Sequence, residues 1–308
     1  MRVLVTGGGG FIGSHVVERL LRDGHSVRVL DNFATGRREN LLPFLADIEL
    51  VEGDLQSYER ANIAVRDVEL VLHQAALPSV PRSVQDPLTS NASNVIGTLN
   101  ILLAARDSGV ERVVFASSSS VYGANRTLPK AEELSPEPIS PYAVAKLAGE
   151  GYCRSFHHVY GLETVALRYF NVFGPRQDLL SQYASVVPNF ITALRDGRPL
   201  TIYGDGEQSR DFTYVGNVVE ANVLAMSAAD VSGRVYNIAC GKRITVNRLV
   251  GELEELMGAE ARLVYAEDRP GEVRESLADI GRARAELGYS PSTELREGLL
   301  KTMAHAAP

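Results

Sequence analysis

The sequence lacks most of the features that mark secreted, metal-binding or membrane-spanning proteins. It has two cysteines in 308 residues, and Cys153 and Cys240 match no metal-ligand spacing, so we expect reduced, buried thiols and no bound metal. No segment approaches the roughly 18 continuous apolar residues of a membrane span, and no signal-like apolar stretch precedes the first motif. The net charge of −7 argues against nucleic acid and anionic membranes as partners. These absences together predict a cytoplasmic protein whose ligands are small molecules.

Apolar and helix-like segments alternate through the first half of the chain. Strands are predicted at 2–7, 26–31, 48–55, 69–76 and 112–118, and helices at 11–24, 92–108 and 140–160. This alternation predicts an α/β fold with a doubly wound parallel sheet, whose ligands bind beyond the carboxyl ends of the strands. The second half is less regular, with a strand at 164–174, four shorter apolar runs, and a helix at 245–258 that has one apolar face. We expect a large nucleotide-binding lobe and a smaller C-terminal lobe.

A glycine-rich stretch near the start predicts a dinucleotide site. LVTGGGGFIGSH places Gly7, Gly10 and Gly13 at G-x-x-G-x-x-G spacing between the first strand and the first helix. Glycine lets the backbone approach a pyrophosphate closely, and the helix N-terminus offers it unpaired N–H groups. The alternative is a turn that serves only tight packing. The next strand favours the dinucleotide because it ends at Asp31, an acidic residue placed to bond the adenosine ribose.

The choice of dinucleotide also depends on Asp31. Its charge would repel a 2′-phosphate, so NAD is favoured over NADP, while Arg37 and Arg38 keep NADP open as the alternative. Asp54 ends another strand, where it either helps to hold adenine or caps the following turn. NAD is therefore the predicted cofactor.

A tyrosine and a lysine share one face of a predicted helix. In ISPYAVAKLAGE, Ser140 suits the N-cap and Pro141 the first helical position, so Tyr142 and Lys146 lie in the first two turns. Lysine is rare in this chain, with 4 copies among 31 basic residues. A tyrosine titrates near ~10 and acts as a base at neutral pH only beside positive charge, such as an ammonium and an oxidised nicotinamide ring. The pair predicts an acid–base site; the alternative is an ordinary surface pair.

With these motifs the sequence resembles the extended short-chain dehydrogenase/reductase superfamily. Within it, the chain is most similar to the NAD-dependent epimerase/dehydratase family and its UDP-glucose, UDP-N-acetylglucosamine and UDP-glucuronate 4-epimerases. The motifs that carry the resemblance span nearly the whole chain and are TGGGGFIGSH, DNFATGR, HQAA, NVIGTLNILLAA, FASSSSVYG, SPYAVAK, RYFNVFGPRQ, YGDGEQSRDFTYV and RPGEV. The resemblance implies a Rossmann-type domain at 1–168 that binds NAD. It implies a nucleotide-sugar lobe at 169–308, with segments near 211–240 returning to the large domain.

The serine run in FASSSSVYG restricts the types of reaction that the resemblance allows. Serine runs are typical of flexible linkers, but this one follows the apolar strand VVFA. The resemblance makes Ser118 the hydroxyl that bonds the reacting sugar. Ser119 and Ser120 stand where the family's 4,6-dehydratases carry Asp-Glu and its UDP-glucuronate decarboxylases a Glu. A hydroxyl does not replace a carboxylate as general base without activation, so only oxidation and reduction at one carbon remain implied.

The implied reaction is the 4-epimerisation of a UDP-sugar, which makes the protein an isomerase. Tyr142, as phenolate, removes the proton of the 4-hydroxyl while C4 passes a hydride to NAD. The 4-keto sugar then turns and accepts the hydride on its other face. Ser118 steadies the oxygen, and Lys146 lowers the pKa of Tyr142 and holds the nicotinamide ribose. NAD is regenerated in each cycle and is implied to stay tightly bound.

The resemblance also implies contacts to both ligands. The expected NAD contacts are Gly7, Gly10, Phe11, Ile12, Gly13, Asp31, Asn32, Gly36, Asp54, Leu55, Gln74, Ala75, Ala76, Tyr142, Lys146 and Tyr169. The expected UDP-sugar contacts are Ser79, Ser83, Ser118, Ser119, Ser120, Tyr142, Asn171, Val187, Thr201, Tyr203, Arg210 and Arg269. Of these, the two arginines are expected on the diphosphate, and Thr201 and Tyr203 beside uracil.

The identity of the sugar stays open. Ser276 stands where a tyrosine narrows the pocket of strict glucose/galactose epimerases, so an N-acetyl group at C2 is permitted. Many UDP-glucuronate 4-epimerases carry Thr in place of Asn171 and Arg in place of Asp178, which disfavours the uronate, although Arg195 is available as another cation.

Other functions stay open too. They are a net nucleotide-sugar dehydrogenase or reductase, a 4,6-dehydratase and, from another class, a non-catalytic dinucleotide-sensing protein, which intact Tyr142, Lys146 and Ser118 disfavour. Members of the family commonly form homodimers through helices near 92–108 and 142–160. The stripe Leu99, Leu102, Leu103 and Ala105 fits such an interface, and fits equally a helix buried on its own sheet.

Overall fold

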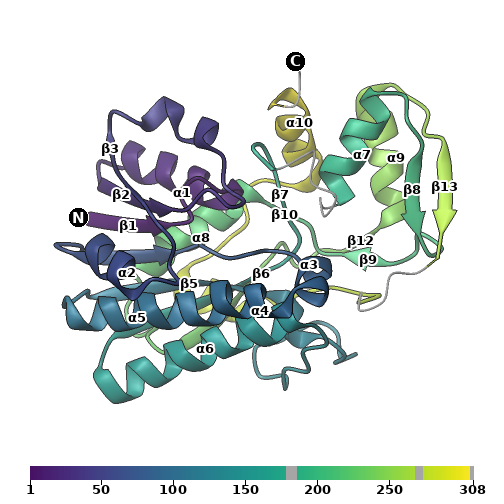
Figure 1. Ribbon diagram of the computed structural model, residues 1–308. Helices are drawn as coiled ribbons and strands as arrows, with labels where there is room; N and C mark the ends of the chain where they lie inside the picture. The colour runs from purple at the N-terminus through teal and green to yellow at the C-terminus, as the bar shows by residue number, and fades with distance from the viewer. Residues whose placement is uncertain (178–185, 268–272, 306–308) are drawn as a thin grey trace.

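A parallel sheet lies at the centre of the molecule. The computed structural model describes residues 1–177, 186–267 and 273–305, so Arg269 and Asp178 lie outside the described residues. The sheet has seven strands in the order β11-β6-β5-β4-β1-β2-β3 (Figure 1). They are β1 (Arg2–Thr6), β2 (Ser26–Asp31), β3 (Ile48–Glu52), β4 (Leu70–His73), β5 (Arg112–Ser118), β6 (Glu163–Tyr169) and β11 (Arg234–Ile238). The order reverses beside β1, as in a Rossmann sheet, which confirms the predicted fold class.

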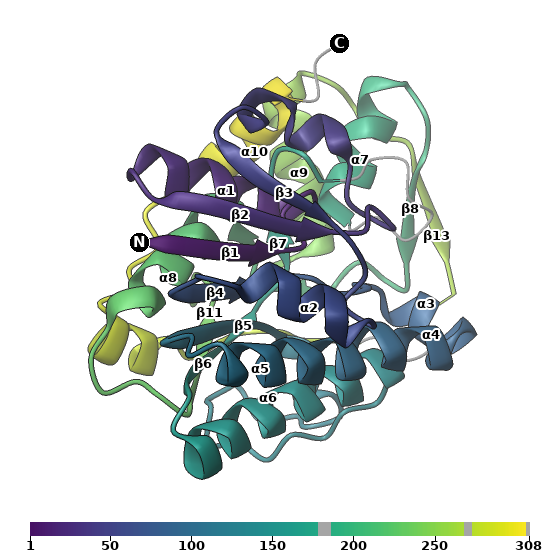
Figure 2. The ribbon, with the colours of Figure 1, turned by 60° about the vertical axis from the view of Figure 1, so that its left-hand side comes forward.

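Two helix layers cover the sheet because successive side chains of each strand point to opposite faces. Val3 and Val5 join the core under α1 (Phe11–Arg22) and α8 (Val215–Ser227). Leu4 joins the core on the other face. That face is covered by α2 (Tyr58–Val65), α5 (Gly97–Asp107) and α6 (Pro141–Tyr160). Figure 2 shows the two layers on opposite sides of the strands.

The second half of the chain also builds a smaller lobe, on the right of Figure 1. The predicted apolar face of α9 (Val246–Met257) is buried there and packs with α7 (Val186–Arg195). The other elements are α10 (Leu295–His305) and the pairs β8 (Leu200–Tyr203) with β13 (Leu263–Ala266), β7 (Val172–Phe173) with β10 (Thr213–Tyr214), and β9 (Ser209–Arg210) with β12 (Ile244–Thr245).

Several elements depart from the sequence expectation. The strand predicted at 164–174 divides, because Asn171 takes a φ of 35° that a strand cannot continue through. The helix predicted at 92–108 begins as a π-helical turn, η3 (Ala92–Ile96), and continues as α5. Among the helices, α2, α7, α8 and α10 were not predicted. Short elements also missed were α3 (Val80–Gln85), α4 (Pro87–Asn91), η1 (Arg38–Asn40), η2 (Leu42–Phe44), η4 (Ser119–Tyr122) and η5 (Ala283–Leu287).

Candidate active site

A cleft of about 1140 Å³ opens beyond the carboxyl ends of the central strands. Its walls include the turn after β1, the end of β2, the segment after β4, the end of β5 and the start of α6. The predicted site residues that line it are Gly7, Gly10, Phe11, Ile12, Gly13, Asp31, Asn32, Gly36, Asp54, Leu55, Gln74, Ala75, Ala76, Ser79, Ser118, Ser119, Ser120, Tyr142, Lys146, Tyr169 and Asn171.

Other predicted residues lie apart from this cleft. Ser83 is fully buried, and its hydroxyl accepts the Tyr142 N–H at 3.1 Å and donates to the Val80 carbonyl at 2.7 Å. Arg210 donates to the Arg274 carbonyl at 3.1 Å, within its own lobe. Val187 is buried in the lobe core, Thr201 is exposed on β8, and Tyr203 ends that strand; none of these residues lines the cleft.

The glycine turn leaves no room for side chains. A Cβ on Gly13 would stand 2.0 Å from the Gly7 carbonyl oxygen, and one on Gly7 would stand 2.7 Å from the Ala75 backbone. Gly7 also has a φ of 69°, which L side chains rarely adopt. No side chain caps the start of α1 at Gly10, so that helix end presents its N–H groups and partial positive charge to the cleft. This is a cradle for phosphate groups.

Asp31 stabilises that turn as well as lining the cleft. Its carboxylate accepts the Gly9 N–H at 2.8 Å and the Phe33 N–H at 2.7 Å. Burial raises the pKa of Asp31, and these backbone donors oppose the rise. The sequence pattern did not reveal this second, structural role, because one donor lies in the turn after β1 and the other in the segment after β2, and the pattern describes the path of neither.

The neighbouring acidic and basic residues have partners of their own. Asp54 accepts the Asn32 side-chain amide at 2.8 Å and the Gln56 N–H at 2.8 Å, so it both organises its turn and lines the cleft. Arg38 is paired with Glu52 at 2.6 Å.

Tyr142 and Lys146 project from the start of α6, as the Tyr-x-x-x-Lys spacing predicted. Ser140 caps the helix by accepting the Ala143 N–H at 3.2 Å, and Pro141 follows as the first helical residue. The Lys146 ammonium donates to the Ala116 carbonyl at 2.7 Å and lies 5.9 Å from the centre of the Tyr142 ring. The helix thereby presents a phenol and a buried cation beside the end of β5.

The electrostatics of this pair differ from a simple lysine-activated tyrosine. Burial raises the pKa of Tyr142, and a hydrogen bond with Ser118 opposes that rise. Burial lowers the pKa of Lys146 to about 8. Both shifts favour the neutral forms, so a phenolate here needs further positive charge in the cleft.

The serine run is an ordered wall of the cleft. Ser118 ends β5 and caps the turn η4, its hydroxyl accepting the Ser120 N–H at 3.2 Å and donating to the Ser120 hydroxyl at 3.1 Å. Ser117, Ser118, Ser119 and Ser120 all line the cleft. The linker interpretation is therefore excluded.

The far end of the cleft approaches the smaller lobe. The Asn171 amide donates to the Asp211 carbonyl at 3.1 Å and lies 3.5 Å from the Ser276 hydroxyl. Asn171 thus joins the cleft to the segment that carries Ser276.

Sequence reasoning missed some cleft residues. Arg176 and Gln177 line it, although only Tyr169 and Asn171 were assigned from their motif RYFNVFGPRQ. Arg176 takes a φ of 63° and pairs with Glu18 of α1, neither of which a sequence pattern reveals. Arg82 also lines the cleft, one helical turn after Ser79, and that spacing was the available signal.

Within the described residues, no three His, Cys, Asp or Glu side chains gather as a metal site requires. None of the helices in those same ranges is both long and apolar enough to cross a membrane.

Comparison with known proteins agrees with this geometry. Residues 3–239 match the NAD dependent epimerase/dehydratase family. The UDP-glucose 4-epimerase of Thermotoga maritima, solved with UDP-glucose, is 40% identical, with a TM-score of 0.95 over 99% of this chain and 98% of that one. A UDP-N-acetylglucosamine 4-epimerase of Methanobrevibacter ruminantium, solved with UDP-N-acetylmuramic acid, is 42% identical, with a TM-score of 0.94 over 99% and 97%. The UDP-glucose 4-epimerase of Thermus thermophilus, solved with NAD, is 40% identical, with a TM-score of 0.91 over 99% and 98%.

The residues of the cleft fit the cofactor of that family. The glycine turn is a cradle that a single Cβ would fill, and it faces an uncapped helix N-terminus, as a pyrophosphate requires. Asp31 lines the same cleft at the end of β2, where an NAD ribose is bonded in Rossmann folds. The cofactor is NAD, and the chain belongs to the NAD-dependent epimerase/dehydratase family.

Proposed function

We propose that the protein is an NAD-dependent UDP-sugar 4-epimerase that inverts C4 of a UDP-hexose through a transient 4-keto sugar. One observation carries the proposal: Tyr142, Lys146 and Ser118 meet at one end of a dinucleotide cleft whose adjoining wall holds Ser119 and Ser120 in place of carboxylates. This arrangement supplies one acid–base group and a cation, and nothing in that wall for eliminating water.

NAD would be held by the glycine turn from Gly7 to Gly13, by Asp31, and by Lys146 at the reacting end, with the remaining predicted contacts between them. When bound, it supplies a hydride acceptor and, once reduced, a hydride donor. Because oxidation and reduction occur in one cycle, the cofactor is not consumed.

Tyr142 is the proposed base for the sugar 4-hydroxyl. Its phenol is disfavoured as phenolate by burial alone, so it depends on the Lys146 ammonium, the Ser118 hydroxyl and the positive charge of oxidised NAD. Ser118 would bond the reacting oxygen and share its proton with Tyr142. On the return step Tyr142, now a phenol, gives the proton back.

The dehydratase and decarboxylase alternatives are disfavoured at the serine wall. Dehydration requires a general acid and a general base that act at neighbouring carbons of the sugar. Within the described residues, no carboxylate or imidazole contacts the hydroxyls of Ser119 and Ser120 to activate them for either task. A net dehydrogenase or reductase uses the same three residues and remains the second candidate.

The UDP-sugar is proposed to bind between the serine wall and the smaller lobe. Ser79 and Asn171 line the cleft on that side and would contact the sugar and phosphates. The roles proposed for Ser83, Val187, Thr201, Tyr203, Arg210 and Arg269 would require the lobe or the ligand to bring them to the nucleotide.

Either of two sugars is proposed, glucose or N-acetylglucosamine, each with its C4 epimer. The solved relatives carry both kinds of name. The small Ser276 beside Asn171 supports an open pocket at C2. UDP-glucuronate stays as the third candidate, disfavoured by Asn171.

The domain division of the sequence analysis is retained as a proposal: residues 1–168 bind NAD, and 169–308 bind mainly the nucleotide sugar, with about 211–240 returning to the large domain. Its support is that α8 packs on α1 and that β11 pairs with β6.

A homodimer is also proposed, through the outer faces of α4, η3 and α6, where Leu88, Ile96 and Val144 are exposed. Leu102 and Ala105 of the predicted stripe are instead buried on their own sheet. Sedimentation of the protein and of a Val144→Glu variant would test the interface.

The cytoplasm is the proposed compartment. Both cysteines are free thiols, and burial raises the pKa of Cys240 to about 12, which suits inert thiols in a reducing environment.

The experiment that tests the function is incubation of the purified protein with UDP-glucose, UDP-N-acetylglucosamine and UDP-glucuronate, separately and without added NAD. We expect one or more to be converted to its 4-epimer with no net NADH. Net NADH formation would indicate the dehydrogenase, and loss of the 6-hydroxyl the dehydratase. If none of the three substrates is converted, even with NAD added, the proposed function is wrong.

The Tyr142→Phe variant separates an enzyme from a dinucleotide sensor. We expect it to retain NAD and to lose roughly 10²–10⁴-fold in kcat, since it lacks only the acid–base group. Unchanged turnover would remove Tyr142 from the reaction.

A further inference from the structure

A buried ion pair lies directly behind the serine wall. Arg168 of β6 donates to both oxygens of Glu150 of α6, at 2.8 and 2.7 Å, and both side chains are 4% exposed. Neither residue lines the cleft. Desolvation offsets most of the attraction in such a pair, so stability alone does not account for it.

Three successive residues of β5 are bound by three successive turns of α6. Ser118 bonds Tyr142, the Ala116 carbonyl accepts from Lys146 at 2.7 Å, and the Ser117 hydroxyl donates to Glu150 at 2.5 Å. Gly149 lets the helix approach this closely, because a Cβ there would meet the Phe115 ring at 2.4 Å. Glu150 is thus the third residue of α6, after the proposed catalytic residues Tyr142 and Lys146, that forms a hydrogen bond with the end of β5.

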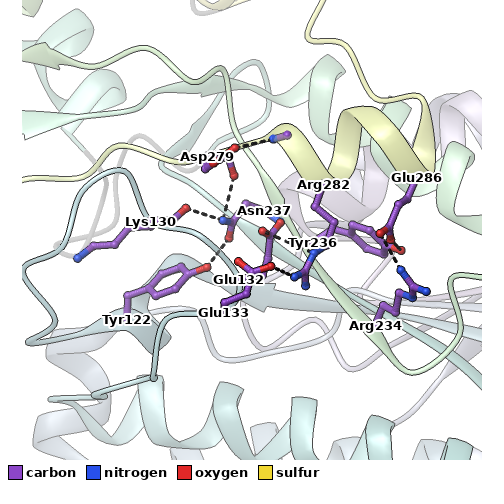
Figure 3. Close-up of polar contacts among 11 residues, drawn as sticks. Tyr122, Lys130, Glu132, Glu133, Arg234, Tyr236, Asn237, Asp279, Arg282 and Glu286 are labelled. Carbon is purple, nitrogen blue, oxygen red and sulfur yellow. Dashed lines mark hydrogen bonds and ion pairs between the residues drawn. The ribbon is translucent and has the colours of Figure 1, made fainter.

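The other side of the pair is anchored in the core. The Arg168 guanidinium lies 4.7 Å from the centre of the Tyr122 ring, whose hydroxyl donates to Asn237 at 2.7 Å. Figure 3 shows Asn237 also bonded to Lys130 and Asp279, through their backbone carbonyls. These contacts hold the Arg168 guanidinium in place, and its two hydrogen bonds in turn hold the carboxylate of Glu150.

We propose that Glu150 and Arg168 form a positioning pair for the reaction: they fix Ser117 on β5, and thereby hold the Ser118 hydroxyl and the Lys146 ammonium against Tyr142. The inference rests on the proposed function and adds two residues that touch neither substrate nor cofactor.

The charges around Lys146 give Glu150 an electrostatic part in this role. On α6, Glu150 and Cys153 face the ammonium; from β4 it is faced by His73, and Arg168 lies behind Glu150 on β6. Burial lowers the pKa of His73 to about 3 and raises that of Cys153, so both are neutral at physiological pH. Glu150 is the anion of this group. Without it, the Arg168 charge would stand uncompensated near Lys146.

The test compares Glu150→Gln and Ser117→Ala with the control Glu163→Gln, all loaded with NAD. Glu163 of β6 pairs with Arg112 of β5 at 2.7 Å, at the ends of these strands opposite to Ser117 and Arg168, so the control breaks an ion pair far from the cleft. Two quantities are measured: the pH dependence of kcat, and the ultraviolet titration of tyrosinate, in which Tyr142→Phe identifies the Tyr142 signal.

For Glu150→Gln we expect the alkaline limb of kcat to move to lower pH by roughly one unit, and Tyr142 to ionise at lower pH, because the uncompensated Arg168 charge disfavours the Lys146 ammonium and favours the phenolate. Ser117→Ala should lower kcat roughly tenfold without moving the limb, since it leaves every charge in place. Glu163→Gln should change neither quantity.

Unchanged limb and titration in Glu150→Gln would overturn the inference. If that variant does not fold, a wild-type kcat in Ser117→Ala would overturn it instead. Should the wild type convert no UDP-sugar, the proposed function fails while the tyrosinate titration still decides the role of Glu150.

Discussion

The two walls of the cleft are built differently. On the NAD side, backbone and buried side chains bind each other directly: the glycine turn packs on itself, Asp31 accepts two backbone N–H groups, and Lys146 is tied to β5. On the lobe side, predicted nucleotide contacts such as Thr201 and Arg210 do not line the cavity. The proposed reacting groups therefore belong to the wall whose residues bind each other directly, whereas the proposed nucleotide contacts of the lobe would need the lobe or the ligand to bring them to the cleft.

The same substitution in the two regions should expose this difference most strongly. Gly13→Ala places a Cβ 2.0 Å from the Gly7 carbonyl oxygen, where only backbone can give way, so we expect loss of bound NAD and of nearly all turnover. Gly251→Ala in α9 meets nothing within 4 Å and should keep both, with a gain of about 1 kcal/mol in stability. NAD released by denaturation, turnover and urea unfolding measure the pair. Equal behaviour of the two variants would contradict the role of the glycine turn as a phosphate cradle.

A second pair of variants tests the packing of α6 on β5. Gly149→Ala would push a methyl group into the Phe115 ring, and we expect roughly 1–3 kcal/mol of lost stability together with a lower kcat, because Tyr142 and Lys146 lie on the same helix. Gly151→Ala, two residues along, faces open space and is the control. If Gly149→Ala loses stability but keeps the kcat of the wild type, the helix position does not control the reaction.

The pH dependence should report Lys146. Because burial lowers its pKa to about 8, kcat is expected to fall as pH rises above that value and the ammonium is lost. Lys146→Arg keeps its charge at all accessible pH values and should remove this limb, at some cost in kcat. An alkaline limb that survives in Lys146→Arg would have to belong to another group.

The lowered pKa of Lys146 also affects stability, and rising pH, which should lower kcat, has the opposite effect on the free energy of unfolding. Between about 8 and the ordinary value of 10.5, the unfolded chain binds more protons at this lysine than the folded protein does. The contribution of Lys146 to the free energy of unfolding therefore rises with pH across that window. Urea unfolding of the wild type and Lys146→Arg at both ends of the window would measure it.

The NAD side was also the more predictable from sequence. The glycine turn, Asp31 and the Tyr142–Lys146 pair are local patterns, in which the spacing along one strand or helix is also the spacing in space. Glu150 and Arg168 could not be predicted in this way, because they meet only through the register that sets Ser117 opposite Arg168. Asn171 illustrates a third case: its motif was found, but the positive φ that ends β6 was not.

Ser276, which contacts Asn171, allows the lobe side of the cleft to be tested. We expect Ser276→Tyr to lower kcat/KM for UDP-N-acetylglucosamine roughly tenfold relative to UDP-glucose, because the larger ring would occupy space beside Asn171. Ser276→Ala keeps that space and should leave the ratio unchanged. Both substrates are assayed by separation of the 4-epimers, so that each variant serves as its own control for folding. An equal loss on both substrates would mean that Ser276 shapes the lobe but not the C2 pocket. A loss of kcat/KM confined to UDP-N-acetylglucosamine would show that the lobe side of the cleft sets the preference for the sugar, while Tyr142 and Lys146 act on either sugar.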